Sequence, residues 1–141
     1  MNLKRLLSLS LILLAVGVLP ANGQSKSHHV LFALTSSDEI DWKLTIGNIR
    51  NLLAGLPGAD TEVEVVVYGP GLSFLRKAST AEADIQALEA KHVHFVACKN
   101  SMKQQHVTAD GLISGVSTVP SGVIEVVTKQ EQGWSYIKAG R

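Results

Sequence analysis

The side chain best suited to chemistry is the chain's one cysteine, Cys98. It ends an apolar run over residues 92–98, and residues 99–105 after it predict a helix or turn. A thiol near a helix N-terminus, beside Lys99 and Lys103, has its thiolate favoured by the helix dipole and by positive charge. The pattern therefore indicates a reactive cysteine, although a lone cysteine in a strand can also be a small buried apolar residue.

Histidines offer a second candidate chemistry, metal binding. His92 and His94 share one face of the predicted strand, with Cα atoms about 7 Å apart. Cys98 has the same parity but lies about 13 Å from His94, too far for one metal to hold both. The pair His28 and His29 alternates faces, and no zinc motif is present. We therefore expect solvated or hydrogen-bonded histidines, and neither a metal nor a cofactor.

A glycine-rich turn and a hydroxyl-rich segment are weaker candidates for ligand binding. Gly69 and Gly71 follow a predicted strand, where a turn can offer backbone N–H groups to an anion. The patterns of nucleotide-binding loops are missing. Thr35 and Ser36 end another predicted strand and could contribute hydroxyl groups to a cleft, although capping of a helix at Asp38 also explains such residues. A packed turn and a helix cap are the competing interpretations.

Other catalytic constellations are not indicated. The chain has no G-x-S-x-G elbow for a hydrolase nucleophile. Glu62 and Glu64 alternate with valines, which predicts a solvent-facing edge of a strand rather than a catalytic pair of carboxylates.

The N-terminus has the features of a secretory signal peptide over residues 1–23. Lys4 and Arg5 precede an apolar run of about 14 residues, and the small residues Ala21 and Gly23 fit a cleavage site. The run is short of the roughly 20 residues that span a bilayer as a helix, so no stable membrane insertion is expected after leader removal. We predict an exported protein, with the periplasm or a location further out as its destination.

Removal of 23 of 141 residues leaves 118, enough for one compact domain over residues 24–141. The predicted mature chain has 11 basic and 12 acidic residues, a formal charge of −1. Such a balance gives no electrostatic footprint for nucleic acid. A single cysteine cannot form an intramolecular disulfide, which is unusual in an oxidising compartment.

Five segments predict strands: residues 28–34, 62–68, 92–98, 116–119 and 134–138. Helical signals lie between them. Asp38 is a suitable N-cap for a helix ended by Pro57-Gly58. Its predicted apolar stripe consists of Trp42, Ile46, Ile49, Leu53 and Leu56.

Three further helical pieces are expected. Residues 71–78 predict a short one, and Ser79 and Glu82 form a capping box for a helix toward Lys91. Ser121 is expected to cap the last helix, which would run through Gln132. Alternating strands and helices predict an α/β domain with a mainly parallel sheet and helices on both faces. In such sheets, functional residues gather at the carboxyl ends of the strands.

Several motifs appear together in an order that is similar to a known family. The segments are residues 29–32, 48–53, 65–71, 96–102, 119–123 and 132–137, which include the Gly-Pro-Gly turn and Ala97-Cys98-Lys99-Asn100-Ser101-Met102. Together they resemble the DsrE/DsrF-like family, in its small stand-alone branch, over nearly all of residues 28–138.

The resemblance implies a five-stranded Rossmann-like or flavodoxin-like sheet in three layers, and a homo-oligomer such as a trimer or hexamer. It also implies that Cys98 matches the position that holds a persulfide in sulfur-relay members. There the thiolate accepts a sulfane sulfur from a donor protein and passes it to an acceptor protein. The relay members are cytoplasmic, whereas this chain carries a predicted export leader.

Three functional hypotheses follow. In the first, the protein is a periplasmic persulfide carrier with a sulfurtransferase-like activity at most, in which Lys99 and Lys103 favour the Cys98 thiolate and Asn100 or Ser101 hydrogen-bonds it. In the second, it is a non-enzymatic oligomeric module that binds a small ligand or a protein, and Cys98 only packs. In the third, Cys98 is a redox sensor that forms a sulfenic acid or an intermolecular disulfide.

Overall fold

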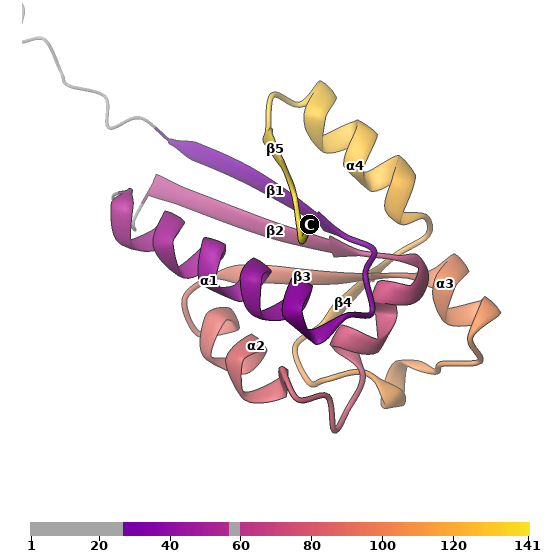
Figure 1. Cartoon of the computed structure of the whole chain (residues 1–141). Helices are drawn as coiled ribbons and strands as arrows, with labels where there is room; N and C mark the ends of the chain where they lie inside the picture. Colours follow the sequence, from indigo (N-terminus) through magenta and orange to yellow (C-terminus); the bar gives the residue numbers. More distant parts are fainter. Residues whose placement is uncertain (1–26, 57–59) are drawn as a thin grey trace, which may run out of the picture.

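The computed structural model describes residues 27–56 and 60–141, in which five strands form one sheet (Figure 1). The strands are β1 (His28–Leu34), β2 (Thr61–Val67), β3 (Val93–Cys98), β4 (Ser117–Val119) and β5 (Ser135–Lys138). Their order across the sheet is β4-β3-β2-β1-β5, and each neighbouring pair is parallel. All five predicted strands are confirmed, within a residue at either end. The predicted signal peptide and the Pro57-Gly58 helix stop lie outside the described residues.

The helices occupy both faces of the sheet, as expected. They are α1 (Glu39–Gly55), α2 (Glu82–Glu89), α3 (Lys99–Gln104) and α4 (Gly122–Glu131), with the 3-10 helices η3 (Gly69–Leu75) and η4 (Ala109–Gly111). Figure 1 shows α1 and α2 on one face and α4 on the other, with α3 at the carboxyl edge of β3. Successive steps from β1 to β4 move in one direction across the sheet, whereas α4 returns the chain to β5 beside β1. The reversal places α4 on the opposite face because parallel crossovers are right-handed.

Helix α1 begins where the sequence predicts. The Asp38 carboxylate accepts a hydrogen bond of 2.8 Å from the backbone N–H of Ile40, which satisfies a free donor of the first turn. Trp42, Ile46 and Ile49 face the sheet and are buried. The helix is thus held by one cap and one apolar stripe.

Three local predictions are wrong in detail. The capping box does not form, because Glu82 accepts a hydrogen bond from the backbone N–H of Ala78 rather than from Ser79, and α2 begins only at Glu82. Ser79 instead accepts from the N–H of Ala81 within a turn. The short helical piece is a 3-10 helix that begins two residues earlier than predicted, since the Gly69 turn already starts it. Ser121 is at the N-cap of α4, but its side chain makes no capping hydrogen bond.

The two faces of the sheet contribute unequally to the core. The face under α1 and α2 holds the large cluster, with Phe32, Phe74 and Phe95 fully buried among aliphatic side chains. Under α4 the buried cluster has three strand residues, Leu31, Val66 and Val96. Most of the apolar burial therefore lies on the first face. Across the residues described, no helix has both the length and the apolar character needed to cross a membrane.

Candidate functional site

Cys98 lies at the carboxyl end of β3, on the face of the sheet that α4 covers. It is the N-cap residue of α3, with extended backbone angles, and the residue is only 4% exposed. The carboxyl ends of β2 and β4 flank it, because both strands pair in parallel with β3. The cysteine is therefore at the sheet edge that the sequence indicates, beneath the surface rather than on it.

Uncharged hydrogen-bond donors surround the sulfur. Burial raises the pKa of the Cys98 thiol, but the backbone N–H of Gly122, the hydroxyl and N–H of Ser101 and the N–H of Asn100 lower it, and the net pKa is below the ordinary value. The side chain of Cys98 does not meet the geometry of an N-cap hydrogen bond to the first turn of α3. The four donors lower the pKa because they stabilise negative charge on the sulfur. The site thus favours the thiolate by converging dipoles.

Ser101 links the cysteine to the glycine-rich turn. Its hydroxyl oxygen accepts a hydrogen bond of 2.8 Å from the backbone N–H of Gly69, and its side chain is buried. A serine hydroxyl has one proton, and this bond leaves that proton free to point at the Cys98 sulfur. Gln105 completes the link by donating to the Gly69 carbonyl over 2.7 Å. Ser101 therefore has a defined donor role that its sequence position alone did not fix.

The glycines of the turn are explained by packing. Gly69 adopts φ +58°, the left-handed region, and its N–H and C=O are already engaged by Ser101 and Gln105. A Cβ at Gly71 would lie 2.8 Å from the Leu34 carbonyl oxygen, so only glycine fits against the end of β1. These contacts account for both residues without a ligand. An anion site at the turn remains a prediction.

Sequence reasoning missed Tyr68 and Gly122. Tyr68 follows β2 directly, and a Cβ on Gly122 would lie 2.9 Å from the Tyr68 Cβ, so α4 begins in close contact with this ring. Burial, and secondarily Tyr136, raise the pKa of the Tyr68 hydroxyl. The register β2 to β3 places Tyr68 beside Cys98. The signal available in the sequence was position alone: Tyr68 is the last residue of one predicted strand, and Gly122 comes three residues after the end of another.

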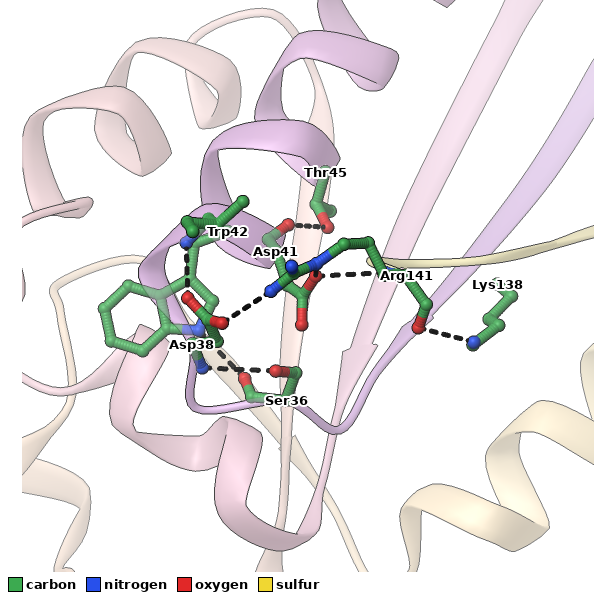
Figure 2. Close-up of polar contacts among 8 residues, drawn as sticks. Ser36, Asp38, Asp41, Trp42, Thr45, Lys138 and Arg141 are labelled. Atoms are coloured by element: carbon green, nitrogen blue, oxygen red, sulfur yellow. Dashed lines mark hydrogen bonds and ion pairs between the residues drawn. The ribbon is translucent and has the colours of Figure 1, made fainter.

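The hydroxyl-rich segment after β1 serves helix α1 (Figure 2). The Ser36 hydroxyl accepts from the backbone N–H of Asp38 over 3.1 Å, and its carbonyl accepts from the Trp42 indole over 2.9 Å. Hydrogen bonds from Ser36 and from Arg141 lower the pKa of Asp41 to about 2. The Arg141 side chain also reaches Asp38 over 2.6 Å, which ties the last described residue to the start of α1. Ser36 is thus engaged in capping.

The remaining predicted residues are on the surface. Thr35, Lys99, Asn100 and Lys103 have exposed side chains. The groups that lower the Cys98 pKa are uncharged donors, so a contribution from the two lysines stays a prediction.

His29, His92 and His94 lie at the amino ends of their strands, opposite to the carboxyl end at which Cys98 lies. His92 precedes β3 with φ +63°, and His94 is exposed at the second position of the strand. Together with His29, which bonds Glu62 over 3.0 Å, they line a shallow surface pocket. In the described part of the chain, no three histidine, cysteine or acidic side chains are arranged to hold a metal ion.

The prediction that Glu64 faces solvent is wrong. Its side chain is buried, 9% exposed, and pairs with Lys129 of α4, with Nζ and Oε2 2.8 Å apart. Glu62 is exposed as expected. Alternation correctly predicts that Glu62 and Glu64 share one face of the strand, but α4 covers that face at Glu64 and not at Glu62.

Comparisons with known proteins agree with this fold. The model of the DsrE/DsrF-like family matches residues 12–139. Protein MTH1491 of unknown function from Methanobacterium thermoautotrophicum is 37% identical, with a TM-score of 0.77 over 79% of this chain and 99% of that one. BT1422 of unknown function from Bacteroides thetaiotaomicron, 12% identical, shares the fold with a TM-score of 0.67 over 83% of this chain and 99% of its own. None of the curated proteins matches.

Proposed function

The chain belongs to the DsrE/DsrF-like family, which is linked to sulfur relay, and from that premise we propose that Cys98 carries sulfane sulfur as a persulfide. The observation that carries the proposal is the position of a buried thiol at the carboxyl end of β3, where the Ser101 hydroxyl and the backbone N–H groups of Asn100 and Gly122 lower its pKa. The thiolate is the nucleophile in sulfur exchange, and a lowered pKa raises its fraction near neutral pH. The donors at the site also suit a persulfide anion, which carries the same charge.

The proposed step is an exchange of one sulfur atom. The Cys98 thiolate forms a bond to the terminal sulfur of a donor persulfide, and the bond between the two donor sulfurs breaks. The electron pair leaves with the donor, which takes the proton that Cys98 gave up and becomes a thiol. No external oxidant or reductant is needed, because one persulfide and one thiol give one thiol and one persulfide. Transfer onward to an acceptor thiol is the same step in reverse.

We propose that this chemistry takes place outside the cytoplasm. The support is the leader-like sequence of residues 1–23, with its two basic residues, apolar run and small residues at the cleavage position. Donor and acceptor would then be proteins or small sulfur compounds of the periplasm.

A homo-oligomer is the second part of the proposal. We define the α4–β5 patch as Val123, Ile124, Val127 and Tyr136, four large apolar side chains that are roughly half exposed or more. Ile124 is 65% exposed, whereas Gly122, two residues earlier on the same first turn of α4, is buried. Adjacent exposed apolar residues on one element favour association. A trimer or hexamer that covers this patch is the expected assembly.

One observation favours a different function, a binding module in which Cys98 is structural. Cys98 is only 4% exposed, as expected for a packing residue. In that case Cys98→Ala would leave ligand or partner binding intact, and the thiol would react slowly near neutral pH.

Intact-mass measurement after incubation with polysulfide tests the proposal. The wild-type chain, without its leader, should gain the mass of one sulfur atom, and dithiothreitol should remove it. The Cys98→Ser variant is the matched control and should gain nothing. An unmodified wild type, or equal gain in both proteins, would refute the persulfide role.

A further inference from the structure

Two of the contacts between helix α4 and the sheet lie two turns apart, near the two ends of the helix. At its first residue, Gly122 packs against the Tyr68 side chain, and its N–H acts on the Cys98 sulfur. Seven residues later, Lys129 reaches Glu64 in the middle of β2. Residues seven apart lie on the same side of an α-helix, about 10 Å from each other along its axis. One face of α4 therefore joins the cysteine site to the Glu64 site.

The ion pair of Glu64 and Lys129 is enclosed. Both side chains are largely buried, and the Lys129 ammonium lies 4.1 Å from the centre of the Trp134 ring. The second oxygen of Glu64, Oε1, is buried without a hydrogen-bond partner among the described residues. Burial raises the pKa of Glu64, against the attraction of Lys129, while Glu125 raises it and His94 lowers it. Burying a carboxylate with one oxygen left without a partner costs desolvation free energy, so this ion pair is not explained by a gain in stability alone.

Apart from this ion pair, few apolar contacts pack α4 against the sheet. Gly122 is the one residue of the helix that is fully buried. Val126 is half-buried and packs on Leu31, Val66 and Val96, while the other three apolar residues of the helix face outward. The position of α4 along the sheet is therefore set largely by Glu64 and Lys129 at one end and by the Gly122 contact at the other.

We propose that Glu64 and Lys129 are positioning residues for Cys98: their ion pair fixes α4 on the sheet so that the backbone N–H of Gly122 reaches the sulfur. Neither residue touches the cysteine. Both act through the helix, at a distance of two turns. The inference rests on the proposed function, since it describes how the same cysteine site is kept ready to react.

The test is the pH dependence of alkylation by iodoacetamide, recorded as intact mass on the otherwise unaltered protein. Cys98 is the one cysteine of the chain, so the whole signal belongs to it. The midpoint of the rate profile reports the titration of the thiol, and the plateau at high pH reports access to the sulfur. Lys129→Met should move the midpoint to higher pH and raise the plateau, because α4 loosens and the Gly122 donor withdraws.

Matched variants separate positioning from general loosening. Lys129→Arg keeps the charge and should keep the wild-type midpoint. Arg50→Met breaks an ion pair of 2.6 Å between α1 and α2 on the opposite face, and should also leave the midpoint unchanged. Should Lys129→Met fail to fold, Glu64→Gln removes the same attraction with little change in shape. A wild-type midpoint in both Glu64→Gln and Lys129→Met, or an equal shift in Arg50→Met, would overturn the inference.

Sulfur loading is not needed for this readout, so the two proposals fail separately. A protein that takes up no sulfur, but whose midpoint responds to Lys129→Met, would refute the persulfide carrier and retain the positioning role. A protein that loads sulfur at Cys98, but whose alkylation midpoint does not change in Lys129→Met, would retain the persulfide carrier and refute the positioning role.

Discussion

On the face covered by α1 and α2, the strand side chains are apolar and fully enclosed, whereas the face under α4 mixes Leu31 and Val66 with Glu64 and Cys98. The first face stabilises the fold through area removed from water. The second carries a thiol, a buried ion pair and an outward apolar patch, which are costly features for a core. The comparison indicates a division between the two faces: the face under α1 and α2 provides most of the stability of the fold, and the face under α4 holds the candidate reactive thiol.

Core truncation should show the largest difference between the faces. Phe74 is fully buried between Trp42 and Phe95, at ring-centroid distances of 5.5 and 6.1 Å. Phe74→Ala should cost about 3–5 kcal/mol of unfolding free energy, because it removes a ring and leaves a cavity. Val126→Ala under α4 should cost only about 1 kcal/mol, since the side chain is half-buried. Urea unfolding measures both, and equal losses would contradict the division.

Ser101→Ala should have the next largest effect, on the thiol rather than on the fold. The variant loses the hydroxyl that stabilises negative charge on Cys98 and that accepts from Gly69. A hydrogen bond to a charged group contributes about 1.5–3 kcal/mol, so the thiolate should become less stable by that amount. The alkylation midpoint of Cys98 would move to higher pH. Ser73→Ala, which removes a hydroxyl bonded to the Pro70 carbonyl, is the control and should not change it.

Much of this architecture follows from the sequence, because alternating apolar runs and the Asp38 cap are local signals. Position after a strand was enough to place Cys98 at the correct edge. The donors that act on it were not accessible in the same way, because Gly122 is 24 residues further along the chain and reaches the sulfur only when α4 crosses the sheet. The prediction that Glu64 faces solvent is wrong for the same reason. Alternation shows which residues share a face of the strand, whereas tertiary packing decides whether that face is exposed to solvent.

The two faces should also respond to pH with opposite signs. Asp41, at the start of α1, has its pKa lowered from 3.8 to about 2, so its contribution to stability is present above about pH 4 and is lost as the pH falls through about 2. Glu64 has its pKa raised above 4.5, so its contribution declines as the pH rises from 4.5. In a plot of unfolding free energy against pH, Asp41→Asn should reduce the slope on the acid side. Glu64→Gln should reduce the slope above pH 4.5. Parallel profiles for both variants would contradict this assignment.

The smallest effect on folding is expected at the α4–β5 patch. Val123→Ser with Val127→Ser changes exposed residues, so the unfolding free energy of the dilute monomer should change by about 0.5 kcal/mol or less. Assembly should respond instead, with a lower sedimentation coefficient than wild type. Ile40→Ser, at an exposed apolar residue of α1, is the control and should assemble normally. A double variant that sediments as wild type would place the interface elsewhere.

The central claim is that the face under α4 holds a reactive thiol. Its most direct test is the rate of sulfur loading on Cys98 as a function of pH, followed by intact mass with polysulfide as donor. The account predicts one sulfur atom per chain, no gain in Cys98→Ser, and a midpoint below the ordinary pKa of a cysteine thiol, about 8.5, because the donors of α3 and α4 favour the thiolate. Loading that is absent, or that has its midpoint at or above that value, would contradict it.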